Sequence, residues 1–243
     1  MMELTLCVVV IAFALVQSVF GVGLLVFGTP TLLLLGLPFE EVLAYLLPCS
    51  IVISALQVIG GGGGFRLDPL RTRFLVFAAP LVLLGTALIL TVGVGLDVRL
   101  IVGAVLIFSG AIRLLGPARQ VLSRLVRRHL SGFLVILGAV HGLSNLGGGV
   151  LTLIVGSVYD VKEEIRRQIA FCYGVMASLQ VATLWATSTA DAVPWLLPLL
   201  PALAAVTYLA VGNRAFLAAN RAVYQLALTA LIIFFGLALV VNG

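Results

Sequence analysis

Charged residues are scarce in this sequence. Asp, Glu, Lys and Arg make up 9% of its 243 residues, whereas hydrophobic residues make up 62%. A soluble domain carries about 25% charged residues, so this chain has too few polar groups to cover its apolar surface in water. The composition excludes a soluble protein and predicts an all-α polytopic membrane protein.

Groups typical of enzymes, metal sites and nucleic-acid surfaces are also missing. The apolar segments contain no pair of carboxylates, no Ser-His-Asp set and no metal cluster, and no basic run is interleaved with aromatic residues. The three cysteines have neither metal-ligand nor disulfide spacing: Cys7, Cys49 and Cys172. We therefore expect no enzyme activity, no cofactor, no metal and no nucleic-acid partner. The N-terminus lacks the basic region of a signal peptide, so we expect the first segment to be retained.

The runs without Asp, Glu, Lys or Arg set the architecture: 4–39, 42–65, 74–96, 100–112, 130–159, 168–190, 192–213 and 222–243. A spanning helix needs about 20 mostly apolar residues, so the five runs of 22 to 24 residues predict one span each. The 13-residue run is extended by Val98, Leu114 and Leu115, because Arg99 and Arg113 can snorkel to the interfaces.

Two of the runs have lengths that fit neither one span nor two. Segment 4–39 has 36 residues and segment 130–159 has 30, and both carry glycine in their middle. Each predicts either a span plus a half-helix or a re-entrant hairpin of two short helices. Broken backbone in lipid requires burial by protein or a cavity beside it.

Polar positions in the two parts of the chain match at an offset of 123 residues. The matching pairs are Thr29 with Thr152, Glu40 and Glu41 with Glu163 and Glu164, Cys49 with Cys172, and Gln57 with Gln180. This pattern predicts an internal duplication, with a first membrane repeat at 1–120 and a second at 121–243. Each repeat would open with a glycine-broken or re-entrant helix, followed by three spans.

The orientation follows from Lys and Arg, which favour the cytoplasm in short loops. If each long segment crosses the membrane once, 8 of the 14 Lys and Arg residues lie on the cytoplasmic side. If segment 130–159 instead enters and leaves the membrane on the same side, 13 of them lie on the cytoplasmic side. We therefore expect a hairpin there, and by symmetry also at 4–39. The halves would then be inverted repeats, as in many secondary transporters. An ordinary eight-pass bundle is the alternative.

His141 is a titratable side chain deep in an apolar segment. It changes protonation near neutral pH, which makes it a candidate substrate donor or proton-coupling group. The alternative is a neutral histidine bonded to a neighbouring helix. The run Gly147, Gly148 and Gly149 that follows should break the helix and expose backbone N–H groups.

A half-helix that starts at this run would direct its positive end at the break, and would bind an anion without a buried Lys or Arg. Ser144, Asn145 and Thr152 could add side-chain donors. The alternative is close helix packing through small residues.

The first half offers a related break. Gly28, Thr29 and Pro30 predict a short half-helix over 31–35, because Pro suits the first turn and Thr29 would cap it. The break is either the counterpart of the Gly147 site or a simple cap. Gln57 and Gln180 could face each other and bind substrate, or bond water at the interface. Cys49 with Ser50, and Cys172 with Tyr173, could line the same cavity.

The chain resembles the TauE/SafE sulfite-exporter family, also called the TSUP family of membrane permeases, over essentially its whole length. The resemblance is carried by the breaks Gly21-Val22-Gly23 with Gly28-Thr29-Pro30, and His141-Gly142 with Gly147-Gly148-Gly149, and by the turn Gly36-Leu37-Pro38. Leu24, Leu25, Leu153 and Ile154 depart from the family's glycines and proline, which implies a less open first-half site.

The resemblance implies a secondary transporter of a small organosulfur or sulfur oxyanion, such as sulfite, a sulfonate or thiosulfate. We expect it in the cell inner membrane, with the lipid bilayer and a small anionic substrate as partners. A passive anion channel and a non-transporting scaffold are the alternatives, and a homodimer is an open alternative to a monomer.

Overall fold

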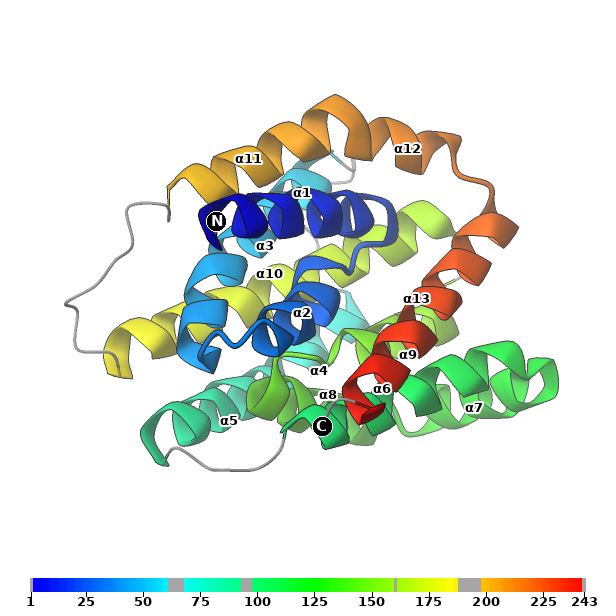
Figure 1. Cartoon of the computed structure of the whole chain (residues 1–243). Coiled ribbons are helices and arrows are strands. Elements are labelled where there is room, and N and C mark those ends of the chain that lie inside the picture. Colours follow the sequence, from blue (N-terminus) through cyan, green and yellow to red (C-terminus); the bar gives the residue numbers. More distant parts are fainter. Residues whose placement is uncertain (1, 61–67, 93–97, 160, 188–197, 242–243) are drawn as a thin grey trace.

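The computed structural model describes residues 2–60, 68–92, 98–159, 161–187 and 198–241, and every regular element in these ranges is a helix (Figure 1). The prediction of an all-α polytopic membrane protein is confirmed. Within the described part, five stretches are long and apolar enough to cross a bilayer: Met2–Phe20 (α1), Phe39–Gly60 (α3), Pro69–Val92, Lys162–Thr187 (α10) and Leu199–Ala218. The stretch Pro69–Val92 consists of α4 (Pro69–Phe77) and α5 (Ala79–Val92).

The remaining elements complete the bundle. Leu199–Ala218 consists of α11 (Leu199–Thr207), the π-helical turn η2 (Tyr208–Gly212) and α12 (Asn213–Ala218). The shorter apolar helices are η1 (Leu24–Gly28) with α2 (Thr29–Leu34), α8 (Leu130–Ser144) and α9 (Gly148–Val158). The last three helices are α6 (Val98–Leu114), α7 (Gly116–Arg128) and α13 (Arg221–Val241).

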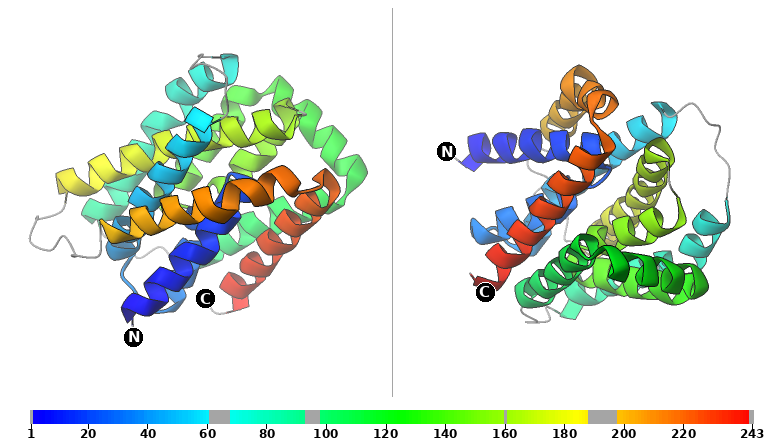
Figure 2. Two further views of the ribbon diagram at one scale, coloured as in Figure 1. Left: turned by 90° about the horizontal axis from the view of Figure 1, so that it is seen from above. Right: turned by 90° about the vertical axis from the view of Figure 1, so that its right-hand side faces the viewer.

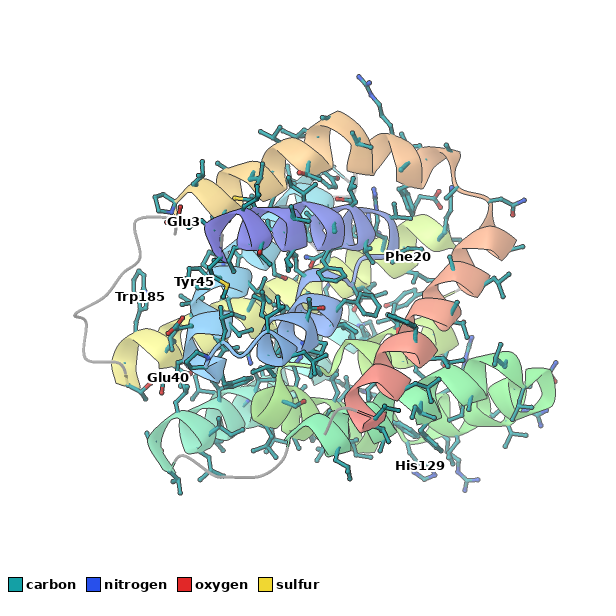
Figure 3. All side chains as sticks on the ribbon, in the orientation of Figure 1. Glu3, Phe20, Glu40, Tyr45, His129 and Trp185 are labelled. Carbon is teal, nitrogen blue, oxygen red and sulfur yellow. The ribbon has the colours of Figure 1, made fainter. Side chains whose placement is uncertain are left out.

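The first long segment reverses direction at Gly21, whose φ of 76° suits glycine. The Gln57 side chain on α3 donates to the Gln17 carbonyl on α1 over 2.9 Å, so the late turns of both helices lie together. Figure 3 shows Glu3 and Glu40 at one end of the molecule and Phe20 toward the other. Since α1 and α3 run the same way, η1 and α2 return the chain to the end where α1 begins.

The second long segment forms a hairpin. α8 ends at Ser144 and α9 begins at Gly148. Arg127, just before α8, donates from Nε to the Ser157 carbonyl at the end of α9 over 2.6 Å. The end of α9 therefore lies beside the start of α8, and the predicted hairpin is confirmed. Both long segments reverse, and the first consists of a 19-residue helix long enough to span, α1, followed by a shorter returning helix.

Helices far apart in the sequence pack together (Figure 2): α3 packs against α10 and α5 against α8 around the hydrophobic core, and α6 packs against α13. The last pair approaches closely through glycine, because a Cβ at Gly138 would lie 2.5 Å from the Ala78 carbonyl oxygen. Helix starts also recur at the predicted offset: α3 at Phe39 and α10 at Lys162, α6 at Val98 and α13 at Arg221. The two repeats, 1–120 and 121–243, and their inverted orientation stay predictions.

Candidate functional site

The second helix break is built around Asn145. This residue has a left-handed backbone with a φ of 60°, and its N–H donates to the His141 carbonyl over 2.7 Å, which ends α8. Asn adopts this conformation more readily than most residues because its short polar side chain can hydrogen-bond locally. A Cβ at Gly147 would lie 2.7 Å from the His141 Cβ, so glycine is required there. The predicted break at the glycine run is confirmed.

Asn145 links the two breaks. Its Nδ2 atom donates to the Thr29 Oγ1 atom, 116 residues earlier, over 2.9 Å, and both side chains are fully buried. The Asn145 Oδ1 atom has no hydrogen-bond partner among the described residues. Amide orientation is assigned from the hydrogen-bond network, and in either orientation one end of this amide lacks a protein partner. A polar ligand or water is expected there.

The first-half helix differs from the prediction in its start. It begins at Leu24 with the π-helical turn η1 and continues into α2, which ends at Leu34. The expected half-helix over 31–35 is therefore too short. Thr29 lies inside this continuous helix and makes no capping hydrogen bond at the start of α2. The prediction of a Thr29 cap is wrong, and its hydroxyl bonds Asn145 instead.

His141 makes two hydrogen bonds that define its neutral form. Its Nδ1 atom accepts from the Gly147 N–H over 3.2 Å, and its Nε2 atom lies 3.1 Å from the Gln180 Oε1 atom. A proton on Nε2 satisfies both bonds. Gln180 in turn donates to the Thr86 hydroxyl over 3.3 Å, and Thr86 donates to the Gly142 carbonyl over 3.2 Å. The arrangement is that of a neutral histidine bonded to a neighbouring helix.

Gln17 plays the corresponding part at the first break. Its Oε1 atom accepts from the Leu24 N–H over 3.3 Å, and its Nε2 atom donates to the Ser50 hydroxyl over 3.1 Å. Leu24 and Gly147, whose N–H groups are capped in this way, are 123 positions apart. Gln17 is not among the predicted site residues, although a side-chain amide within the first apolar run is a visible signal.

Tyr173 on α10 reaches the start of α9. It is fully buried, and its hydroxyl has no hydrogen-bond partner among the described residues. A Cβ at Gly148 would lie 1.9 Å from this hydroxyl and 2.2 Å from the Val26 side chain, so only glycine leaves room for it. The Tyr173 ring centroid lies 5.9 Å from that of His141. Buried tyrosine hydroxyls usually have a partner, which marks this one as a candidate ligand donor.

The start of α9 supplies further donors. Helical hydrogen bonding begins with the Leu151 N–H, which donates to the Gly147 carbonyl over 2.8 Å. The N–H groups of Gly148, Gly149 and Val150 therefore have no acceptor within the helix. They carry the positive end of the helix dipole. These N–H groups and the Tyr173 hydroxyl are therefore candidate donors for an anion at the start of α9.

Several predicted site residues make other contacts. Thr152 donates to the Gly149 carbonyl of its own helix over 2.9 Å, and the Cys49 thiol donates to the Tyr45 carbonyl over 3.1 Å. Gln57 donates to the Gln17 and Ser18 carbonyls, whereas Gln180 bonds His141 and Thr86, so Gln57 and Gln180 have different partners. The Gln57 Oε1 atom is unpartnered within the described ranges. Three others are buried: Gly28 and Pro30 in the first-half helix, and Cys172 on α10.

Two arginines that the charge pattern assigns to loops are buried at helix starts. Arg166 on α10 donates to the Ser18 carbonyl over 3.2 Å and to the Asn213 side chain over 3.3 Å, and stacks 3.5 Å above the Phe216 ring. These contacts tie α10 to α1 and α12. These contacts lie at the end of α1, just before the chain reverses at Gly21.

Arg71 on α4 belongs to a second polar cluster. Its Nε atom donates to the Gln168 side chain over 2.8 Å, and Asp68 accepts from Gln168 and from the Tyr159 hydroxyl, the latter over 2.7 Å. Burial and the Asp68 carboxylate raise the pKa of Tyr159. The cluster fastens α4 to α10 and to the end of the α8–α9 hairpin.

Comparison with known families gives one whole-chain result. The sequence profile described as "Sulfite exporter TauE/SafE" matches residues 6–239. Neither the curated proteins nor the solved structures gave a match. With nearly the whole chain covered, this multi-pass membrane protein belongs to the sulfite exporter TauE/SafE family.

Proposed function

We propose that this protein is a secondary transporter that binds a small sulfur oxyanion or organosulfonate at the start of α9. Membership of the family implies membrane transport of sulfite-type anions. The observation that carries the site is the buried Tyr173 hydroxyl, which has no hydrogen-bond partner among the described residues and lies beside Gly148, the first residue of α9. We propose no catalytic role.

The energetics favour an anion at this position. An unsatisfied buried polar group costs about 1–3 kcal/mol, and a hydrogen bond to a charged group contributes about 1.5–3 kcal/mol. A bound oxyanion would accept from the Tyr173 hydroxyl and from the N–H groups of Gly148 and Gly149. It would thereby satisfy the Tyr173 hydroxyl, which has no hydrogen-bond partner among the described residues. The anion would have to be compact, because the Tyr173 hydroxyl and the Val26 side chain already pack against Gly148.

The Thr29–Asn145 contact suggests how the site is exposed. It joins the broken helix of one predicted half to that of the other. In inverted-repeat transporters, one half rocks against the other around a site near the midplane. We propose that this contact breaks or shifts between the inward-facing and outward-facing states. The inner-membrane location and a homodimer also stay proposals.

His141 offers a route to proton coupling. In the neutral form, its Nδ1 atom accepts from the Gly147 N–H. Protonation of Nδ1 would turn this acceptor into a donor and release the Gly147 N–H beside the anion. The positive imidazolium would also attract the anion. Proton and anion would then bind together. At the first break, Gln17 accepts the corresponding hydrogen bond from the Leu24 N–H with a side chain that does not titrate, so accepting this bond does not by itself require a titratable group.

The test is transport of radiolabelled sulfite into proteoliposomes with and without an imposed proton gradient. A proton-coupled transporter accumulates sulfite against its concentration gradient, and the Tyr173→Phe variant loses most of this uptake. Tyr45→Phe, on α3, is the matched control and keeps it. Flux that only equilibrates would identify a passive channel, and no flux with any sulfur oxyanion or sulfonate would contradict transport.

A further inference from the structure

Helix α7 is basic and has a partly apolar surface. The sequence has no Asp or Glu between Asp97 and Asp160. Within that stretch, α7 carries Arg124, Arg127 and Arg128, and His129 follows directly. A helix with this charge attracts anionic surfaces, and no acidic residue of its own segment neutralises it.

The inner side of α7 is fixed to the protein. Val126 is fully buried. The Ser123 hydroxyl lies 3.3 Å from the Ser157 hydroxyl, and Arg127 donates from Nε to the Ser157 carbonyl over 2.6 Å. These contacts attach α7 to the last turn of α9. The orientation of the helix about its own axis is thereby set.

The outer face of α7, formed by Val121, Arg124, Leu125 and Arg128, points away from the bundle. Val121 is 63% exposed and Leu125 is 47% exposed, and the two arginines beside them are exposed as well. Aliphatic side chains next to arginines are typical of helices at the boundary between headgroups and acyl chains. There, the arginine side chain can lie along the apolar region with its guanidinium in the headgroup layer.

The neighbours of α7 hold it at the membrane. Only Leu115 separates it from the apolar helix α6, and only His129 separates it from the apolar helix α8. In Figure 1, α7 lies at the edge of the molecule beside α6. With such short links, α7 cannot move away from the bilayer in which its neighbours are embedded.

We propose that the outer face of α7 binds the headgroups of anionic phospholipids. Arg124 and Arg128 would contact the phosphate groups, and Val121 and Leu125 would rest against the acyl chains. Anionic lipids attract basic segments beside membrane helices. An acidic protein partner is less favoured, because the apolar part of this face matches acyl chains. Since α7 is bonded to the end of α9, bound lipid would brace the hairpin that carries the candidate anion site.

The test is the thermal stability of the purified protein in mild detergent, titrated with phosphatidylglycerol or with phosphatidylcholine. Phosphatidylglycerol should raise the Tm more than phosphatidylcholine does, and added salt should reduce the difference, because exposed charges are screened. The double variant Arg124→Gln with Arg128→Gln should lose most of the difference. Arg214→Gln, which removes an exposed arginine from α12, is the control and should keep it.

Two outcomes would overturn the proposal. One is a double variant that responds to phosphatidylglycerol as the wild type does. The other is a wild-type response that is equal for both lipids or insensitive to salt, a measurement that does not depend on the variant folding. The experiment involves no sulfite, so its result is separate from that of the transport assay.

Discussion

The Asn145 side chain donates to the Thr29 hydroxyl over 2.9 Å, and this bond joins the broken helices of the two predicted repeats. Both residues are fully buried, and one end of the Asn145 amide is left without a partner in the described part of the chain. A rigid structural link would satisfy both ends of the amide. This is why we propose that the contact changes between the states of the transport cycle.

Replacing Thr29 by Val should weaken both the fold and transport. The substitution keeps the shape but leaves the Asn145 amide without its partner, which costs about 1–3 kcal/mol. Thermal unfolding in detergent should show a lower Tm, and sulfite uptake should fall. Thr31→Val is the control, because the Thr31 hydroxyl donates to the Phe27 carbonyl of its own helix. Equal effects of the two variants would contradict a special role for Thr29.

Replacing Gly148 by Ala should abolish uptake. The added Cβ would lie 1.9 Å from the Tyr173 hydroxyl and must displace it from the start of α9. Gly156→Ala on the same helix is the control, because its Cβ would meet nothing within 4 Å. Ala there should be neutral or stabilise the helix by up to about 1 kcal/mol. Normal uptake by the Gly148→Ala variant would show that Tyr173 does not act at this position.

Replacing His141 by Gln separates capping from proton coupling. Gln can accept from the Gly147 N–H, as Gln17 does from the Leu24 N–H, but it cannot carry a proton near neutral pH. We expect the variant to fold with nearly wild-type Tm, whereas uptake no longer increases with a proton gradient. His141→Ala should lose stability as well. A His141→Gln variant with unchanged gradient dependence would remove His141 from the coupling mechanism.

Much of the site was predictable because polar residues stand out in an apolar sequence. Asn145, His141, Thr29 and the glycine run were identified in this way, and the structure joins Asn145 to Thr29 and His141 to Gly147. The break at the glycine run of the second half was also predictable, whereas in the first half the chain reverses at Gly21 and the helix starts at Leu24, earlier than the predicted start near Thr29.

The missed contacts depend on how helices pack. Tyr173 reaches Gly148 only because α10 lies against α9, and Thr86 bonds Gln180 only because α5 lies against α8 and α10. Neither relationship has a local sequence pattern. The Thr29 cap was predicted wrongly because the π-helical turn before it continues the helix, a feature that Pro30 alone did not indicate.

The most direct test of the anion site is ligand-induced thermal stabilisation of the purified protein by sulfite, thiosulfate, sulfoacetate, taurine, sulfate and small carboxylates. A ligand that binds the folded state raises its Tm. We predict a selective rise with a sulfur oxyanion or sulfonate, retained in Tyr45→Phe. In Tyr173→Phe, the loss of a hydrogen bond to a charged ligand, about 1.5–3 kcal/mol, should weaken binding roughly ten- to hundredfold. An equal rise in Tyr173→Phe and wild type would contradict an anion site at the start of α9.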